Sequence, residues 1–210
     1  MSNNKFERVE VKVILLGESG VGKTSIINRY MNNEFSENEE STIGSTFVSK
    51  EIIRGNVKYK LNIWDTTGQE RYHSVTNLFI KGSQIVILVY SIDSKGSFQG
   101  LDYWHSSLDN NIKGEDYVLA IVGNKCDLID SEAVSEDEAK KFAEDKNAIF
   151  KLVSAKEMPQ GIDDLFENLL DESISRNYIQ NYNENIDNKK KIVKQKKKKS
   201  ICWMHKFFII

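Results

Sequence analysis

The octapeptide GESGVGKT at residues 17–24 has the residue types and the spacing of a loop that binds phosphate. Its glycines allow the backbone to wrap around an anion, and a helix that begins here adds the positive end of its dipole. Lys23 could reach the β- and γ-phosphates of a nucleotide, and the Thr24 hydroxyl could ligate Mg²⁺. A glycine-rich turn without a ligand is the alternative, but the position between an apolar run and a helical segment favours phosphate binding.

A second motif, GNKCDL at residues 123–128, could select the base of that nucleotide. The carboxylate of Asp127 could accept two hydrogen bonds, from N1–H and from the exocyclic amine of guanine. Adenine has no such pair of donors there, and a site built on hydrogen bonds can reject the wrong partner by roughly 10⁴-fold or more. A lone Asn-Lys-x-Asp is often only a polar loop after a strand, so this motif needs support from the rest of the chain.

The third motif is SAK at residues 154–156, which is the weakest of the three when taken alone. All three motifs occur in order, and each follows an apolar run that has the pattern of a strand. Open α/β sheets bind ligands outside the carboxyl ends of their strands. We therefore expect the three motifs to form one guanine-nucleotide site.

Short apolar runs alternate with helical patterns along the chain, and this alternation predicts the elements that position the motifs. Nearly continuous apolar runs at 83–92 and 116–125 indicate strands covered on both faces. Further strands are expected at 9–17, on both sides of Gly55-Asn56 as a hairpin, and at 148–155, with helices near 23–33, 97–111, 135–146 and 161–180. The pattern predicts a three-layer α/β sheet with right-handed crossovers.

The composition of the 210-residue chain fits one domain with a tail. With 40% hydrophobic residues it can bury a sizeable core, and a mean hydropathy of -0.47 without a long apolar run predicts no transmembrane helix. The first residues, MSNNKFERVE, lack a signal segment and the Gly that myristoylation requires. Two cysteines, Cys126 and Cys202, are too few for a disulfide framework, so we expect a reducing intracellular compartment.

The charge of the chain is distributed unevenly. The net charge is -2, but nine of the 29 basic residues lie within residues 189–206, which contain no acid. The rest of the chain therefore carries 20 basic residues against 31 acidic ones, a net charge of −11. Such a body is not expected to bind nucleic acid, and the lysine-rich tail is the one candidate for contact with an anionic surface.

Together these residues resemble the small GTPases of the Ras superfamily, and specifically the Rab family. The likeness spans about residues 8–178 and includes ESTIGSTF at 40–47, WDTTGQERYHS at 64–74 and GNKCD. The wording of GES in the phosphate loop, of ESTIG and of QERYHS most resembles the early-endosomal branch of the Rab family. The resemblance implies a Ras-like G domain, which is a three-layer P-loop NTPase fold with a mostly parallel six-stranded sheet and one antiparallel edge strand.

The resemblance also assigns roles to individual residues. Catalysis would depend on Gln69, which would orient the attacking water, together with Lys23, Thr42 and Gly68. Mg²⁺ would be held by Thr24 and Thr42 and, through a bound water, by Asp65. The residues that would bind GTP or GDP are Ser19, Gly20, Val21, Gly22, Lys23, Thr24, Ser25, Phe35, Thr42, Gly68, Asn124, Lys125, Asp127, Ser154, Ala155 and Lys156. An effector patch would consist of Phe47, Trp64 and Phe79, although their pattern fits plain core packing equally well.

A switch mechanism and its partners follow from the same resemblance. In the GTP state, switch I (about 36–45) and switch II (about 65–79) would be ordered, and loss of the γ-phosphate would release both. No Arg lies between Arg29 and Arg54, so switch I cannot supply an internal arginine finger, a group worth roughly 10³–10⁵ in rate. We therefore expect slow intrinsic hydrolysis, a GTPase-activating protein, a guanine nucleotide exchange factor and trafficking effectors.

Thr67 departs from the Rab pattern, in which Ala is usual at this position. One hypothesis is that Thr67 slows hydrolysis or the rearrangement of switch II without preventing nucleotide binding. A second is that its hydroxyl accepts the γ-phosphoryl group, and a third is that it is a tolerated small residue. The alternative function is accordingly a GTP-binding interaction module with little or no hydrolysis, whereas a P-loop kinase or ATPase is disfavoured by Asp127.

The C-terminal end also departs from the family. Cys202 is followed by eight residues, so the chain has neither a paired-Cys ending nor a C-a-a-X box, and prenylation is in doubt. The lysines and the aromatic end could lie at an anionic membrane interface, with Cys202 acylated as a second signal. A disordered tail, or an extension added by a mistaken reading frame, is the alternative. We expect an N-terminal extension at 1–8, a G domain at 9–180 and a hypervariable tail at 181–210, located at the cytosolic face of intracellular, endosomal membranes.

Overall fold

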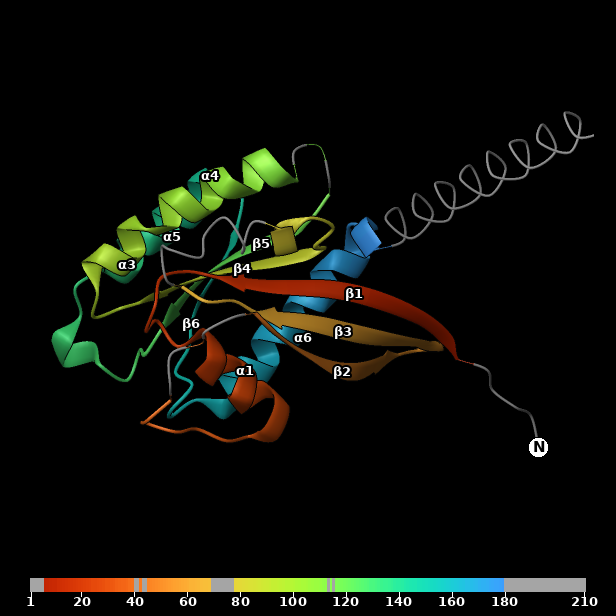
Figure 1. Ribbon diagram of the computed structural model, residues 1–210, viewed down its shortest axis with the longest axis horizontal. Coiled ribbons are helices and arrows are strands. Elements are labelled where there is room, and N and C mark those ends of the chain that lie inside the picture. Colours follow the sequence, from red (N-terminus) through yellow and green to blue (C-terminus); the bar gives the residue numbers. More distant parts are fainter. Residues whose placement is uncertain are drawn as a thin grey trace, which may run out of the picture.

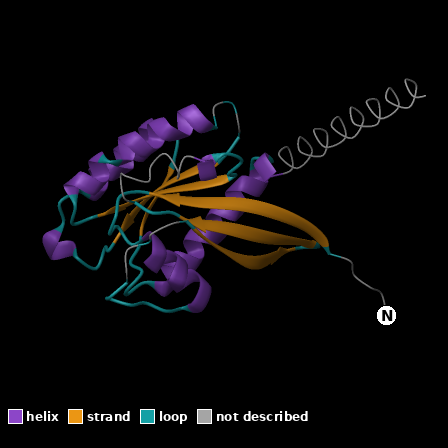
Figure 2. Cartoon of the chain, viewed as in Figure 1, coloured by secondary structure: helices purple, strands orange, loops and turns teal. Residues whose placement is uncertain are grey.

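The computed structural model describes residues 6–39, 42, 45–68, 78–112, 114 and 116–179. Within them, six strands form one sheet that has helices on both of its faces (Figures 1 and 2). The strands are β1 (Glu7–Leu16), β2 (Thr46–Arg54), β3 (Val57–Asp65), β4 (Ile85–Ser91), β5 (Val118–Asn124) and β6 (Ile149–Leu152). The helices are α1 (Lys23–Asn32), α3 (Lys95–Gln99), α4 (Leu101–Asn111), α5 (Glu136–Asp145) and α6 (Pro159–Ser175), with a short 3₁₀ helix, η2 (Ile129–Ser131).

The sheet is parallel except at one edge. The strand order is β2-β3-β1-β4-β5-β6, and the pairs β1–β3, β1–β4, β4–β5 and β5–β6 are all parallel. β2 runs antiparallel to β3, and the turn between them contains Gly55, whose φ of 57° favours glycine. The predicted fold class, a mostly parallel six-stranded sheet with one antiparallel edge strand, is confirmed.

Alternate residues of the central strands enter two separate hydrophobic clusters. Val13 and Leu15 belong to the cluster that includes side chains of α1 and α6, whereas Ile14 and Leu16 belong to the one that includes α3, α4 and α5. Figure 1 shows these two groups of helices on opposite sides of the sheet. Because both faces are covered, every residue of β4 and β5 is buried, which explains their nearly continuous apolar sequences.

Most elements lie within two residues of their predicted bounds, and three differ by more. The helix expected at 97–111 is two helices, because α3 ends and α4 begins at Gly100. The helix expected at 161–180 starts earlier, at Pro159, where the missing N–H and the fixed φ of proline suit a first helical position, and it ends at Ser175. β6 is shorter than 148–155, because the Ala155 N–H bonds to the side chain of Asn124 instead of continuing a ladder.

The topology places the three motifs at one edge of the sheet. Since β1, β5 and β6 are parallel, their carboxyl ends face the same way, and the phosphate loop, GNKCDL and SAK follow these three strands. Within the described residues, no helix combines the length and the apolar character needed to cross a bilayer. The domain boundaries at 8 and 180 remain a prediction, and the tail at 181–210, with Cys202, lies outside the described residues.

Candidate functional site

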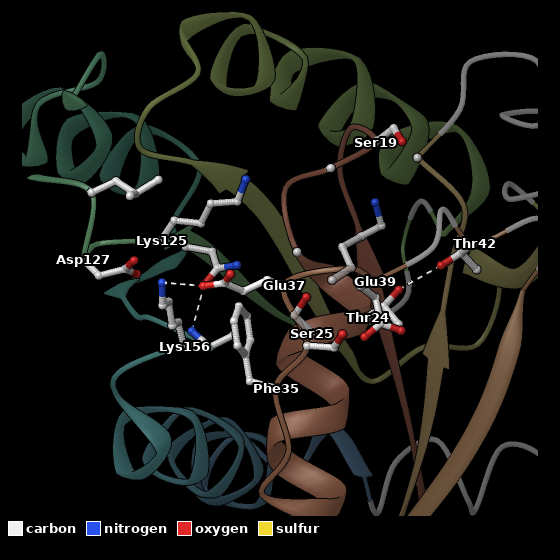
Figure 3. A pocket seen from close by; sticks show the side chains of 18 of the residues that line it. Ser19, Thr24, Ser25, Phe35, Glu37, Glu39, Thr42, Lys125, Asp127 and Lys156 are labelled. Atoms are coloured by element: carbon white, nitrogen blue, oxygen red, sulfur yellow. Dashed lines mark hydrogen bonds and ion pairs between the residues drawn. The ribbon is translucent and has the colours of Figure 1, made fainter.

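A cavity of about 350 Å³ lies at this edge of the sheet (Figure 3). Phe35, Lys125, Asp127 and Lys156 lie at one end of the view, and Thr42 lies at the other. Most of the predicted nucleotide-binding residues line the cavity. They are Ser19, Gly20, Gly22, Lys23, Thr24, Ser25, Phe35, Thr42, Gly68, Asn124, Lys125, Asp127, Ala155 and Lys156.

The phosphate loop is folded around the ammonium group of Lys23. Its Nζ donates to the backbone carbonyls of Gly17 at 2.7 Å and of Glu18 at 2.9 Å. Burial lowers the pKa of Lys23 to about 8, while the carboxylates of Asp65 and Glu18 act in the opposite direction. Gly22 has a φ of 92°, and a Cβ there would lie 2.3 Å from an amide nitrogen of Asn124, so this turn requires glycine. A loop of this shape, followed directly by α1, can present a cation and a helix N-terminus to phosphate.

Asn124 ties the phosphate loop to the SAK loop. Its side chain is 1% exposed, Nδ2 donates to the carbonyl of Val21 at 2.8 Å, and Oδ1 accepts from the N–H of Ala155 at 3.2 Å. Val21 is itself buried, so its part in the site is this carbonyl and not a wall of the cavity. One side chain therefore fixes the relative positions of all three motifs.

The carboxylate of Asp127 is held from behind by Ser154. The Ser154 hydroxyl donates to Oδ1 of Asp127 and accepts from the backbone N–H of Glu157 at 2.9 Å. Ser154 is fully buried, so the structure places it behind Asp127 and not against the cavity. A carboxylate has about four lone-pair positions, so Asp127 can still accept two N–H donors side by side, the arrangement that the edge of guanine offers.

Three oxygen-bearing side chains meet at the other end of the cavity. The Thr24 hydroxyl donates to Oδ2 of Asp65 at 2.7 Å and lies 2.8 Å from the Thr42 hydroxyl, a contact marked in Figure 3. Oδ1 of Asp65 is buried and has no hydrogen-bond partner within the described part of the chain. Burial raises the pKa of Asp65, although the hydrogen bond from Thr24 opposes this. An all-oxygen donor set with an unsatisfied carboxylate oxygen fits Mg²⁺, which prefers oxygen ligands and would offset the cost of burial.

The segment after β3 packs against the phosphate loop. A Cβ on Gly68 would lie 2.3 Å from backbone atoms of Glu18 and Ser19, so only glycine fits there. The Thr66 hydroxyl donates to the carbonyl of Leu15 at 2.6 Å. Thr67 is 3% exposed and is not one of the residues that line the cavity, so its side chain is packed within the protein. Gln69 lies outside the described residues, as does the rest of switch II up to residue 77.

Five residues line the cavity without having been predicted. They are Ser36, Glu37, Glu39, Thr66 and Leu128. Thr66 and Leu128 each adjoin a predicted site residue, so their position in the sequence was a usable signal. Glu37 and Glu39 lie in switch I, where isolated carboxylates in a polar segment carry no signal for a contact.

The three aromatic residues predicted as an effector patch lie together. Phe47 and Trp64 pair across β2 and β3 with ring centroids 5.3 Å apart, and the rings of Trp64 and Phe79 stack at 4.9 Å. Phe47 is 49% exposed, whereas Trp64 and Phe79 are partly buried and pack against the cluster that contains α3, α4 and α5. The group thus combines core packing with an exposed ring, and its contact with a partner remains a prediction.

Comparison with known proteins gives consistent matches over this part of the chain. The sequence profile of the Ras family matches residues 12–175. The chain is similar to Ras-related protein Rab-31 of Mus musculus, with 42% identity over 160 residues, which is 76% of this chain and 81% of the relative. It is also similar to Ras-related protein Rab-17 of Mus musculus, 40% identical over 165 residues (79% and 76%), and to Ras-related protein RHN1 of Nicotiana plumbaginifolia, 38% identical over 156 residues (74% and 78%).

Proposed function

This chain belongs to the Ras family and, within it, to the Rab small GTPases. We propose that the cavity described above binds guanine nucleotide and that the protein acts as a GTP-dependent switch in vesicle traffic. The members of this family are GTPases, so the reaction converts GTP and water to GDP and phosphate. The observation that carries the proposal is the meeting of Lys23, Asp127 and Lys156 in one cavity, although they lie on three distant segments.

At the base end, Asp127 selects guanine. Its carboxylate accepts the N1–H and the exocyclic amine, while the hydrogen bond from Ser154 fixes its orientation. Phe35 packs against the base, and Ala155 and Lys156 complete the pocket. Adenine would leave the Asp127 charge desolvated and unpaired, which is the physical basis of the discrimination.

At the phosphate end, Lys23 and the backbone N–H groups of residues 19–25 bind the phosphates. Bound phosphate would replace the two carbonyl contacts of Lys23 with charged ones and stabilise its protonated form. Thr24, Thr42 and Asp65 would hold Mg²⁺, the last through a water, and the ion would neutralise charge on the phosphates. The Gly68 N–H would bind the γ-phosphate, since this residue lies against the phosphate loop.

Hydrolysis is the proposed end of each cycle. Gln69 orients the attacking water. Because the sequence has no Arg between Arg29 and Arg54, switch I supplies no arginine finger, and the intrinsic rate of hydrolysis is slow. An activating protein is therefore needed for hydrolysis, and an exchange factor for release of GDP. The position of Thr67 supports hydrolysis over the alternative of an interaction module with little turnover, because the residue is buried and is not among those that line the cavity.

The GTP state would order switch I and switch II and present Phe47, Trp64 and Phe79 to an effector. We further propose a peripheral location on the cytosolic face of endosomal membranes. The sequences ESTIG and QERYHS support the endosomal branch. The lysines of residues 189–206 support binding to an anionic membrane surface, because electrostatic attraction contributes roughly 1 kcal/mol per basic residue. Cys202 is the candidate site of lipid attachment.

Single-turnover hydrolysis tests the proposed reaction. Phosphate release from preloaded GTP is compared for the wild type, Gln69→Ala and Thr67→Ala. Gln69→Ala should slow release by about 100-fold, because the water loses its orientation, and Thr67→Ala should stay within about twofold of the wild type, as for a residue away from the reacting atoms. A wild-type protein that binds GTP without turnover, and that Thr67→Ala activates, would favour the interaction module instead.

Liposome flotation tests the membrane contact separately. The full chain should float with vesicles that contain anionic lipid and not with neutral vesicles, and deletion of residues 189–210 should abolish the difference. Equal flotation of the full and the shortened chain would remove the tail from the proposal.

A further inference from the structure

An ion pair joins two loops across the base end of the cavity. Lys156 Nζ lies 2.8 Å from Oε1 of Glu37, although the two residues are 119 positions apart in the sequence. Both residues line the cavity, and Figure 3 shows them side by side with Phe35. Glu37 belongs to switch I and Lys156 to the SAK motif, so the contact connects a segment of the switch directly to the base-binding loop.

Lys156 is the anchored partner of this pair. Arg29 of α1 donates from Nη2 to the carbonyl of Lys156 at 3.1 Å and from Nε to the carbonyl of Ala155 at 2.7 Å. The Ala155 N–H is held in turn by Asn124. The backbone that carries Lys156 is therefore fixed from two sides, independently of Glu37.

Glu37 lies two residues after Phe35, in a segment with few other attachments. Phe35 is partly buried against the cluster that contains α1 and α6. Two residues beyond Glu37, Glu39 accepts from the side-chain amide of Asn28 at 3.2 Å. Phe35, Ser36, Glu37 and Glu39 of this segment line the cavity, and Glu37 connects the segment to Lys156.

Both members of the pair are charged at neutral pH. The hydrogen bond with Lys156 lowers the pKa of Glu37, and the same contact raises the pKa of Lys156. Their side chains are 70% and 47% exposed, so water and salt reach the contact. An exposed pair of this kind makes a small contribution, and that contribution falls as ionic strength rises.

We propose that Glu37 is a positioning residue for nucleotide retention, because its carboxylate ties the segment that carries Phe35 to the anchored Lys156 across the base pocket. The pair has to separate before the base end of the nucleotide can leave. The inference rests on the proposed binding of guanine nucleotide in this cavity. It assigns to Glu37 of switch I an effect on the rate of nucleotide release, without contact with the phosphates.

Release of a fluorescent GDP analogue from the full-length protein, chased with excess GDP, tests the proposal. At low salt, Glu37→Gln should release the analogue about two- to fivefold faster than the wild type, the range expected for an exposed ion pair. In 1 M salt, where the screening length is about 3 Å, the two rates should converge. The association rate should be unchanged within about twofold, because substitutions in one binding site alter dissociation rates far more than association rates.

Three further variants separate a specific contact from a general effect. The control Glu136→Gln breaks an exposed ion pair of similar length with Lys140, 2.7 Å, on α5, and should leave release unchanged. The exchange Glu37→Lys with Lys156→Glu should restore slow release relative to Glu37→Lys alone, since the charges attract again. The inference would be overturned if Glu37→Gln released the analogue at the wild-type rate at low salt. It would also be overturned if the faster release of this variant persisted in 1 M salt. Failure of the wild type to retain the GDP analogue in preference to an ADP analogue would instead overturn the proposed site.

Discussion

Replacing Asn124 by alanine should both destabilise the protein and loosen the nucleotide site. The substitution removes the two hydrogen bonds that join Val21 to Ala155 and leaves a buried carbonyl and a buried N–H unpaired. Each unsatisfied group costs about 1–3 kcal/mol, so the free energy of unfolding should fall by about 2–6 kcal/mol. Without these two hydrogen bonds, the phosphate loop and the SAK loop can separate. GDP release should then accelerate by about tenfold, equivalent to 1.4 kcal/mol.

Urea unfolding with and without GDP, together with GDP release, measures these effects. Asn62→Ala is the matched control, because the Asn62 side chain lies on β3 and donates to the exposed carboxylate of Glu10 at 3.2 Å. The control should change stability by no more than about 0.5 kcal/mol. If Asn124→Ala lowered the free energy of unfolding by less than about 1 kcal/mol and released GDP at the wild-type rate, Asn124 would not hold the two loops together as described.

Three other substitutions probe the phosphate end. Gly68→Ala places a Cβ 2.3 Å from the backbone of Glu18 and Ser19 and should weaken GTP binding more than GDP binding, as measured by competition titration. Asp65→Asn removes the charge that Mg²⁺ would offset, so chelation of Mg²⁺ should speed GDP release far less in this variant than in the wild type. In the nucleotide-free protein, burial lowers the pKa of Lys23 from 10.5 to about 8. The free-energy cost of burying charged Lys23 therefore acts in full below pH 8 and falls as the pH rises towards 10.5. The free energy of unfolding of the wild type, measured with urea, should rise over that window relative to that of Lys23→Met.

The order of elements and the location of the site followed from sequence patterns. The apolar runs of β4 and β5 and the glycine turn at Gly55 are strong local signals, because burial on both faces and a left-handed turn each restrict the residue types allowed. Motifs that follow parallel strands necessarily meet at one edge of the sheet. The cavity therefore contains the predicted phosphate loop, Asp127 and Lys156.

Contacts between distant residues could not be predicted in the same way. Ser154 was expected to contact the nucleotide, but the structure places it behind Asp127, because whether a serine beside a cavity faces it depends on the path of the backbone. The tie between Glu37 and Lys156 joins an exposed glutamate to an exposed lysine, and the chain has many of both. Residue types that are common on every surface identify no partner until the fold brings them together.

Selection of the purine is the central claim, and competition binding measures it most directly. A fluorescent GDP analogue bound to the wild-type protein is displaced by GTP or by ATP over a wide range of concentration. GTP should compete at a concentration roughly 10⁴-fold or more below that of ATP, because only guanine satisfies the carboxylate of Asp127. Displacement by both nucleotides at similar concentrations would contradict it.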